Sequence, residues 1–258
     1  MKLLVFFLAG AVIVLFAGWL TFSGSRGSRK ENSPNSQKNS MIERITLTTK
    51  DNISLVGDYS APDASSERGL LLLHMMPATR TSWAGFAQKA RRTGFHVLAI
   101  DLYGHGESEG GPDGYKTFSD ANHQRSKNDV QAAAEFLKSK GVAKLYLGGA
   151  SIGANLALQH LAENPETSGA FLLSPGLDYR GIQTESSARG LKPEQRVLYA
   201  ASRDDQYSFE SVERLAALRF AGHDVSLRLF ETAGHGTTMF EREPRLMDEI
   251  VEWLAAKK

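Results

Sequence analysis

From Met41 onward, segments typical of β-strands alternate with segments typical of α-helices. The clearest strand is Gly69–His74 (GLLLLH), a solid apolar run of the kind found where helices cover both faces of a sheet. The last helix, Pro244–Ala256, places its large apolar residues on one stripe. Strands separated by such helices require crossover connections. The pattern therefore predicts an α/β fold with a mostly parallel sheet and helices on both faces.

We expect eight strands, of which the first two alternate in the manner of an antiparallel pair at one edge. The strands are predicted at Ile42–Thr48, Ile53–Ser60, Gly69–His74, Phe95–Asp101, Lys144–Gly149, Gly169–Leu173, Arg196–Ala200 and Val225–Phe230. The intervening helices are predicted at Trp83–Arg92, Ser119–Ser139, Ile152–Ala162, Phe209–Phe220 and Pro244–Ala256. Residues 41–258 are thus expected to form one domain.

The first 22 residues include an uncharged, almost wholly apolar run, Leu3–Phe22. As a helix this run is long enough to span a bilayer core of about 30 Å. We favour a single-pass transmembrane anchor over a cleavable signal peptide, because the run is long and no Ala-x-Ala site follows it. Cleavage would instead give a secreted or periplasmic protein. Residues 23–40 are rich in Ser, Asn and basic side chains, and are predicted to form a flexible linker. The side of the membrane is left open.

Charge and cysteine content exclude several kinds of function. The chain has 30 Lys and Arg residues against 29 Asp and Glu residues, so it has no broad positive field to hold nucleic acid. It has no cysteine, which excludes a thiol nucleophile and thiolate metal sites. No His, Asp or Glu cluster has the spacing of metal ligands. We expect no metal and no organic cofactor, and the sequence leaves the oligomeric state open.

A G-x-S-x-G motif lies at the end of the predicted strand Lys144–Gly149, as Gly149-Ala150-Ser151-Ile152-Gly153. Ligands of open parallel sheets sit beyond the carboxyl ends of the strands. A sharp strand-to-helix turn at this point is the context of a nucleophile elbow, and the helix N-terminus directs free N–H groups at developing negative charge. Ser151 is therefore the candidate nucleophile. The alternative is a glycine-bounded turn with an incidental serine.

A serine nucleophile needs a base, and a neutral histidine held by a carboxylate is the usual one. His235 follows the last predicted strand between small residues and is the first choice, with His105 as its main rival. For the carboxylate we expect Asp204 to reach His235, whereas Asp205 is expected to face solvent or cap the next turn. Asp178 is a third option. The chain order Ser151, Asp204, His235 is the order used by serine hydrolases with a nucleophile elbow.

An oxyanion hole should complete this site. One donor is expected to be the backbone N–H of Ile152, the residue after the nucleophile. The other should come from the loop that follows the strand Gly69–His74, where Met76 is the first choice and Met75 the second.

Together these features resemble the α/β-hydrolase superfamily over essentially all of residues 41–258. The segment Asp101–Ser108 (DLYGHGES) is similar to the D-x-x-G-H-G-x-S loop of carboxylesterases, monoacylglycerol-lipase-like and serine-aminopeptidase-like hydrolases. In those proteins the loop is structural, so the resemblance argues against His105 as the base. Relatives usually have His-Gly where this chain has His74-Met75. Many also insert a cap, for which Ser174–Gln195 is too short, so an open site is expected.

The leading hypothesis is a serine hydrolase that cleaves carboxylic esters through an acyl-enzyme, and the open site favours small or surface-presented esters. A thioesterase, peptidase or acyltransferase would use the same machinery. A non-catalytic, membrane-tethered binding protein of the same fold is the alternative from a different class.

Overall fold

The computed structural model describes residues 42–218 and 224–256. The predicted anchor at Leu3–Phe22 and the predicted linker lie outside these residues. Among the helices that are described, none is both long and apolar enough to cross a bilayer.

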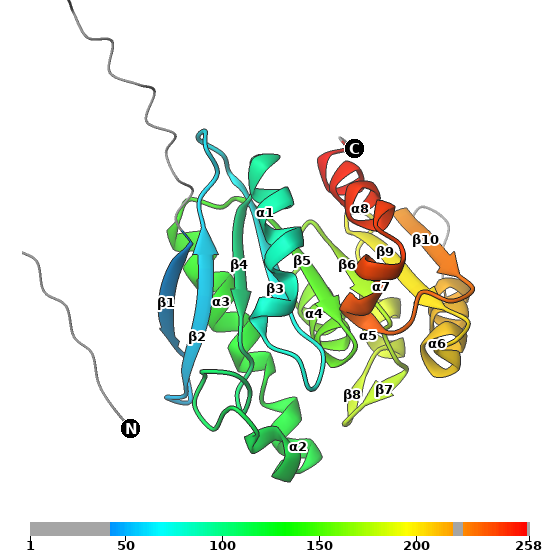
Figure 1. Ribbon diagram of the computed structural model, residues 1–258, viewed down its shortest axis with the longest axis horizontal. Coiled ribbons are helices and arrows are strands. Elements are labelled where there is room, and N and C mark those ends of the chain that lie inside the picture. The colour runs from blue at the N-terminus through cyan, green and yellow to red at the C-terminus, as the bar shows by residue number, and fades with distance from the viewer. Residues whose placement is uncertain (1–41, 219–223, 257–258) are drawn as a thin grey trace, which may run out of the picture. The chain divides into compact units, whose positions relative to one another are not determined.

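Eight strands form one sheet, as predicted (Figure 1). They are β1 (Glu43–Thr48), β2 (Ser54–Ser60), β3 (Arg68–Leu73), β4 (His96–Ile100), β5 (Lys144–Ala150), β6 (Gly169–Leu173), β9 (Arg196–Ser202) and β10 (Asp224–Phe230). Their order across the sheet is β1-β2-β4-β3-β5-β6-β9-β10. The pairs β1–β2 and β2–β4 are antiparallel, and every other pair is parallel. The carboxyl ends of β3, β5, β6 and β9 therefore meet at one edge, where the candidate site residues lie.

Helices cover both faces of this sheet (Figure 1). The longer ones are α1 (Ala84–Arg92), α3 (Lys127–Ser139), α4 (Ile152–Glu163), α6 (Gln206–Ala217) and α8 (Arg245–Ala255). The short ones are α2 (Asp120–Gln124), α5 (Glu185–Gly190) and α7 (Met239–Arg242), with 3-10 turns η1 (Arg80–Trp83), η2 (Gly114–Thr117) and η3 (Gly236–Thr238). Each face has its own hydrophobic core. Leu71 of β3 belongs to the core that also contains residues of α3, α4 and α6, whereas its neighbour Leu72 belongs to the core with residues of α1, α7 and α8.

The segment predicted as one long helix, Ser119–Ser139, is broken into α2 and α3. Asp51, in the turn after β1, accepts hydrogen bonds from Arg125 at the break and from Asn128 just beyond it, each at 2.8 Å. These contacts from a distant turn hold the chain where the local periodicity predicts a continuous helix.

The stretch from Ser174 to Gln195 contains a small hairpin, β7 (Asp178–Tyr179) and β8 (Ile182–Gln183), followed by α5. It is too small to be a cap domain, in agreement with its length. The buried Asn155 of α4 holds it in place, because its amide donates to the Ile182 carbonyl at 2.8 Å and its Oδ1 accepts from the Gly176 N–H at 3.0 Å. The hairpin lies at the end of the sheet that carries the candidate site (Figure 1).

Candidate active site

Ser151 occupies a sharp turn between β5 and α4, as the motif predicts. Its backbone has φ 53° and ψ −121°, a left-handed conformation that non-glycine residues adopt only when the surrounding structure imposes it. Its N–H donates to the Leu173 carbonyl of β6 at 2.9 Å, which fixes the turn to the neighbouring strand. The residue is largely buried, with a relative exposure of 7%.

Gly153 allows α4 to begin directly against the end of β3. A Cβ at this position would lie 2.6 Å from the carbonyl oxygen of His74 and closer still to that of Leu73. The start of α4 therefore meets the loop that carries Met75 and Met76. Ile152 is the first residue of α4, so its N–H has no acceptor within the helix.

His235 and Asp205 form a hydrogen bond of 2.6 Å between Nδ1 and Oδ2. Because a carboxylate oxygen accepts, Nδ1 carries the proton and Nε2 of the neutral ring is left as a base. The imidazole is 37% exposed and the carboxylate 18% exposed. The pair is therefore partly shielded from water and partly open to it.

The expectation that Asp204 reaches His235 is wrong. Asp204 instead accepts the Gly234 N–H at 3.0 Å and pairs with the guanidinium of Arg242 at 2.9 Å. The reason lies in the turn after β9. Asp204 is still held alongside the chain that follows β10, with its N–H on the Glu231 carbonyl, and Asp205 is the residue that precedes α6 and turns inward. The carboxylate that binds His235 is therefore Asp205, one position further along the turn than predicted.

The surroundings of Asp205 favour its ionised form beside His235. Burial opposes its charge, but hydrogen bonds from His235 and from the hydroxyls of Ser208 and Ser174 outweigh that effect and hold its pKa below the usual value. A carboxylate that stays charged can orient the imidazole and stabilise the imidazolium formed during a reaction.

The loop that carries His235 packs directly against the elbow. Gly236 has φ 58°, and a Cβ there would lie 3.4 Å from the Cβ of Ala150, the residue before Ser151. The sulfur of Met75 lies closer still to this position. Residues adjacent to Ser151 and His235 are therefore in contact, and the side chain of Met75 covers the same place.

His74 is fully buried and fixes the loop after β3. Its Nε2 accepts the Leu102 N–H at 3.0 Å, and its Nδ1 donates to the Met75 carbonyl at 3.0 Å. Burial lowers its pKa to about 3, so the ring is neutral. The Met75–Met76 peptide is trans, so holding its carbonyl on His74 directs the Met76 N–H to the opposite side. That N–H meets no protein acceptor in the part of the chain that the structure describes.

His105 takes no part in the His235 site. It is buried, its Nδ1 lies 3.1 Å from the Tyr103 carbonyl, and its ring stacks on Tyr115 with centroids 4.3 Å apart. The surrounding Asp101–Ser108 loop is held by its own bonds, including one of 2.6 Å from the Ser108 hydroxyl to the Asp101 carbonyl. This loop therefore has a structural role at the end of β4.

Two residues near the His235–Asp205 pair were not predicted from the sequence. Tyr179 of β7 faces His235 edge-on, with ring centroids 6.5 Å apart, and its hydroxyl lies 3.0 Å from that of Ser208. Ser174, the residue after β6, accepts the Gly236 N–H on its hydroxyl at 2.9 Å. Only the position of Ser174 directly after a strand could have indicated it. Asp178, the third carboxylate considered, instead accepts the Gly181 N–H within the hairpin.

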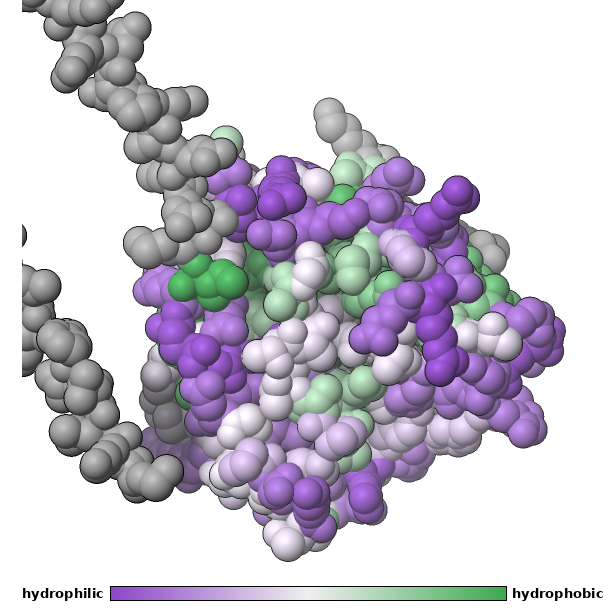
Figure 2. All heavy atoms as spheres, viewed as in Figure 1, coloured by the Kyte–Doolittle hydropathy of each residue, from purple (hydrophilic) through white to green (hydrophobic). Residues whose placement is uncertain are grey.

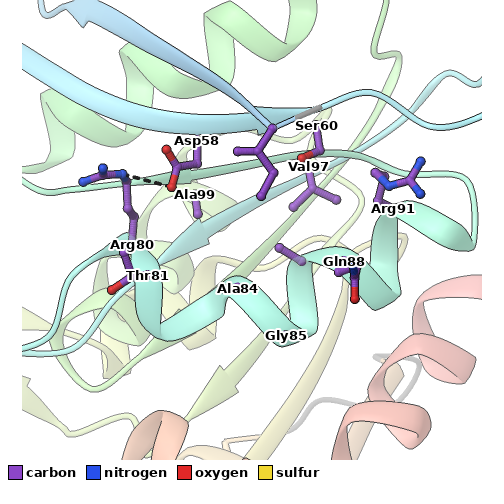
Figure 3. A pocket seen from close by; sticks show the side chains of 12 residues that line it. Asp58, Ser60, Arg80, Thr81, Ala84, Gly85, Gln88, Arg91, Val97 and Ala99 are labelled. Carbon is purple, nitrogen blue, oxygen red and sulfur yellow. Dashed lines mark ion pairs between the residues drawn. The ribbon is translucent and has the colours of Figure 1, made fainter. Parts of the chain in front are cut away.

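A cavity of about 380 Å³ lies elsewhere, between α1 and the strands β2 and β4 (Figure 3). Its floor includes Val97 and Ala99, and at one end Arg80 pairs with Asp58 at 3.1 Å. On the face shown in Figure 2, apolar residues are interspersed with hydrophilic ones, and no large continuous apolar surface is visible. None of the candidate catalytic residues lines this cavity. No group of acidic and histidine side chains suited to a metal ion occurs among the residues described.

Comparison with protein families decides the classification. Residues 70–201 match the alpha/beta hydrolase fold. The chain belongs to this family. A search of curated proteins gave no match.

Solved structures of several hydrolases have a similar fold. An esterase of Pyrococcus furiosus is similar, with a TM-score of 0.68 and 20% identity over 83% of this chain and 90% of its own. A dienelactone hydrolase of Anabaena variabilis has a TM-score of 0.66 and 18% identity, over 83% and 94% of the two chains. An esterase of Exiguobacterium antarcticum has a TM-score of 0.64 and 12% identity, over 83% and 100%. At these identities the similarity establishes the fold.

Proposed function

We propose that this protein is a serine hydrolase of small carboxylic esters, with Ser151 as nucleophile, His235 as base and Asp205 as the orienting acid. The observation that carries the proposal is the 2.6 Å bond between Asp205 and His235, in a loop packed against the elbow of Ser151. The esterases among the structural neighbours support the choice of substrate class.

In this mechanism the Ser151 hydroxyl oxygen attacks the ester carbonyl carbon while its proton passes to Nε2 of His235. The tetrahedral intermediate then collapses, and the alcohol leaves with that proton. Water then attacks the acyl-enzyme, with His235 again taking and returning the proton, and the carboxylic acid is released from Ser151. Asp205 stays ionised throughout and stabilises the imidazolium.

The oxyanion hole in this proposal consists of the N–H groups of Ile152 and Met76. Ile152 begins α4, so its N–H also benefits from the positive end of the helix. His74 aims the Met76 N–H by holding the Met75 carbonyl. Each such donor is typically worth about 3–4 kcal/mol of barrier.

Labelling with a fluorophosphonate tests the nucleophile, and p-nitrophenyl acetate turnover tests the reaction. We expect the wild type to be labelled and active, and Ser151→Ala to be neither. The Ser108→Ala variant removes another buried serine hydroxyl and serves as the control that keeps both properties. Equal turnover by the wild type and Ser151→Ala would favour the non-catalytic binding protein. Profiling esters of graded acyl length, with thioesters and peptides alongside, then defines the substrate.

From the sequence alone we also propose that Leu3–Phe22 anchors the enzyme to a membrane. The full-length chain should then stay with membranes after alkaline carbonate extraction, and a chain starting at Met41 should not. N-terminal sequencing distinguishes an anchor from a signal peptide, because cleavage would remove Leu3–Phe22. Recovery of the full-length chain in the soluble fraction would contradict the anchor.

A further inference from the structure

Ser174 shares the positive φ of the proposed nucleophile and its N–H bond to a neighbouring strand, one strand further along the sheet. It directly follows β6, has φ 51°, and donates its N–H to the Ala200 carbonyl of β9 at 2.8 Å. Ser151 likewise follows β5 and donates to the last residue of β6. The other non-glycine residues with positive φ in the described chain, Asn52 and Arg180, belong to turns between paired strands. Ser174 therefore adopts a costly conformation without being a hairpin turn.

Complete burial excludes Ser174 as a second nucleophile. Its relative exposure is 0%, so no substrate carbonyl can reach the hydroxyl in this conformation. Its contacts point to a different use. The hydroxyl oxygen accepts the N–H of Gly236, the residue after His235, at 2.9 Å.

The same hydroxyl has one proton left to donate. The Ser174 hydroxyl helps to hold the pKa of the Asp205 carboxyl below its usual value, and so does the hydroxyl of Ser208, which donates to the Ser174 carbonyl at 3.4 Å. Ser174 thus binds the loop of the base through an accepted hydrogen bond, and its hydroxyl also favours the charged form of the acid. These two loops are 30 residues apart in the sequence, and the His235–Asp205 bond joins them.

Resting on the proposed function, we propose that Ser174 is a positioning residue that holds Asp205 and the His235 loop in the geometry needed for proton transfer. It acts through these two groups and does not touch the substrate. A backbone role would favour glycine at this position, because glycine adopts positive φ without steric cost. The presence of a serine is explained by the hydroxyl.

A pair of variants separates the hydroxyl from the backbone conformation. Ser174→Ala removes the hydroxyl and keeps the Cβ, whereas Ser174→Gly removes the hydroxyl and relieves the conformational cost. We expect both to lower kcat by about 10- to 100-fold, the range expected for losing a hydrogen bond to a charged group, with little change in KM. Ser174→Gly should also melt at a higher temperature than Ser174→Ala.

Ser108→Ala is the matched control. The Ser108 hydroxyl is buried, accepts the Val56 N–H at 2.9 Å and donates to a carbonyl, so it has the same bonding pattern away from the His235 pair. Its kcat should stay at the wild-type value. Wild-type kcat in both Ser174 variants would overturn the proposal.

Proton NMR of the full-length chain gives a readout independent of turnover. The Nδ1 proton of His235, bonded to Asp205, should give a downfield signal that Asp205→Asn removes. We expect this signal to shift or broaden in both Ser174 variants and to stay in place in Ser108→Ala. It can also be recorded in the Ser151→Ala background. If the wild type does not hydrolyse esters, the proposed function is wrong. The NMR signal then still tests whether Ser174 positions the His235–Asp205 pair. An unmoved signal overturns this positioning role.

Discussion

Asp204 and Asp205 are consecutive acids of one turn, and their side chains leave it in different directions. Asp204 binds Gly234 and Arg242, whereas Asp205 binds His235. Both acids therefore contact the loop after β10, but only Asp205 contacts the imidazole. Ionised Asp205 fixes the proton on Nδ1, which leaves Nε2 for the proton of Ser151.

Exchanging each acid for its amide tests this assignment. Asp205→Asn should lower kcat by about 10⁴-fold, because an amide stabilises the wrong tautomer of His235. Asp204→Asn keeps an acceptor for the Gly234 N–H and should lower kcat by less than about tenfold. Steady-state kinetics on p-nitrophenyl acetate measure both. A larger loss in Asp204→Asn than in Asp205→Asn would reverse the assignment.

At the scale of elements, the candidate site depends on how closely α4 approaches β3. Gly153 makes this approach possible, since the carbonyl oxygens of Leu73 and His74 occupy the space of a side chain. The same contact brings the Ile152 N–H near the loop of Met76. The β7–β8 hairpin, held by Asn155, then adds Tyr179 beside His235. Packing between elements thus builds the site from the five loops that follow β3, β5, β6, β9 and β10.

Adding a methyl group at Gly153 should separate α4 from β3. We expect Gly153→Ala to lower the free energy of unfolding by about 1–3 kcal/mol and to reduce kcat, because rigid backbone cannot move aside cheaply. Gly85→Ala, in α1, is the control: its added Cβ would meet only the end of Met247 at 3.9 Å. That change should be neutral or stabilising by up to about 1 kcal/mol. Urea denaturation compares the two, and an unaffected Gly153→Ala would refute the close-packing argument.

Across the whole molecule, buried titratable groups govern the response to pH. Burial lowers the pKa of His74 to about 3 and that of His160 to about 4. It also lowers the pKa of His105 and His123. In the unfolded chain these rings gain protons below about pH 6.5, so folding loses stability as the pH falls through that value. Burial acts oppositely on Asp129, raising its pKa to about 7, so that group favours folding at lower pH.

A variant of His160 isolates one of these contributions. Below about pH 6.5, wild-type stability should fall more steeply than that of His160→Gln, by about 1.4 kcal/mol per pH unit, until the pH approaches 4. Urea denaturation at pH 7, 6 and 5 gives the two slopes. Parallel slopes would show that His160 does not stay neutral in the folded state.

The sequence by itself determined the fold class, the eight strands and the positions of Ser151 and His235, because periodicity and glycine spacing are local properties. The motifs around Ser151 and Asp101 also indicated the hydrolase family. Tertiary structure decided the rest. Contacts with Gly234, Arg242 and His235 select Asp205 over Asp204, and the adjacency of β6, β9 and β10 brings Ser174 to both loops. The direction of a side chain in a turn depends on partners far away in the sequence, and no local pattern records them.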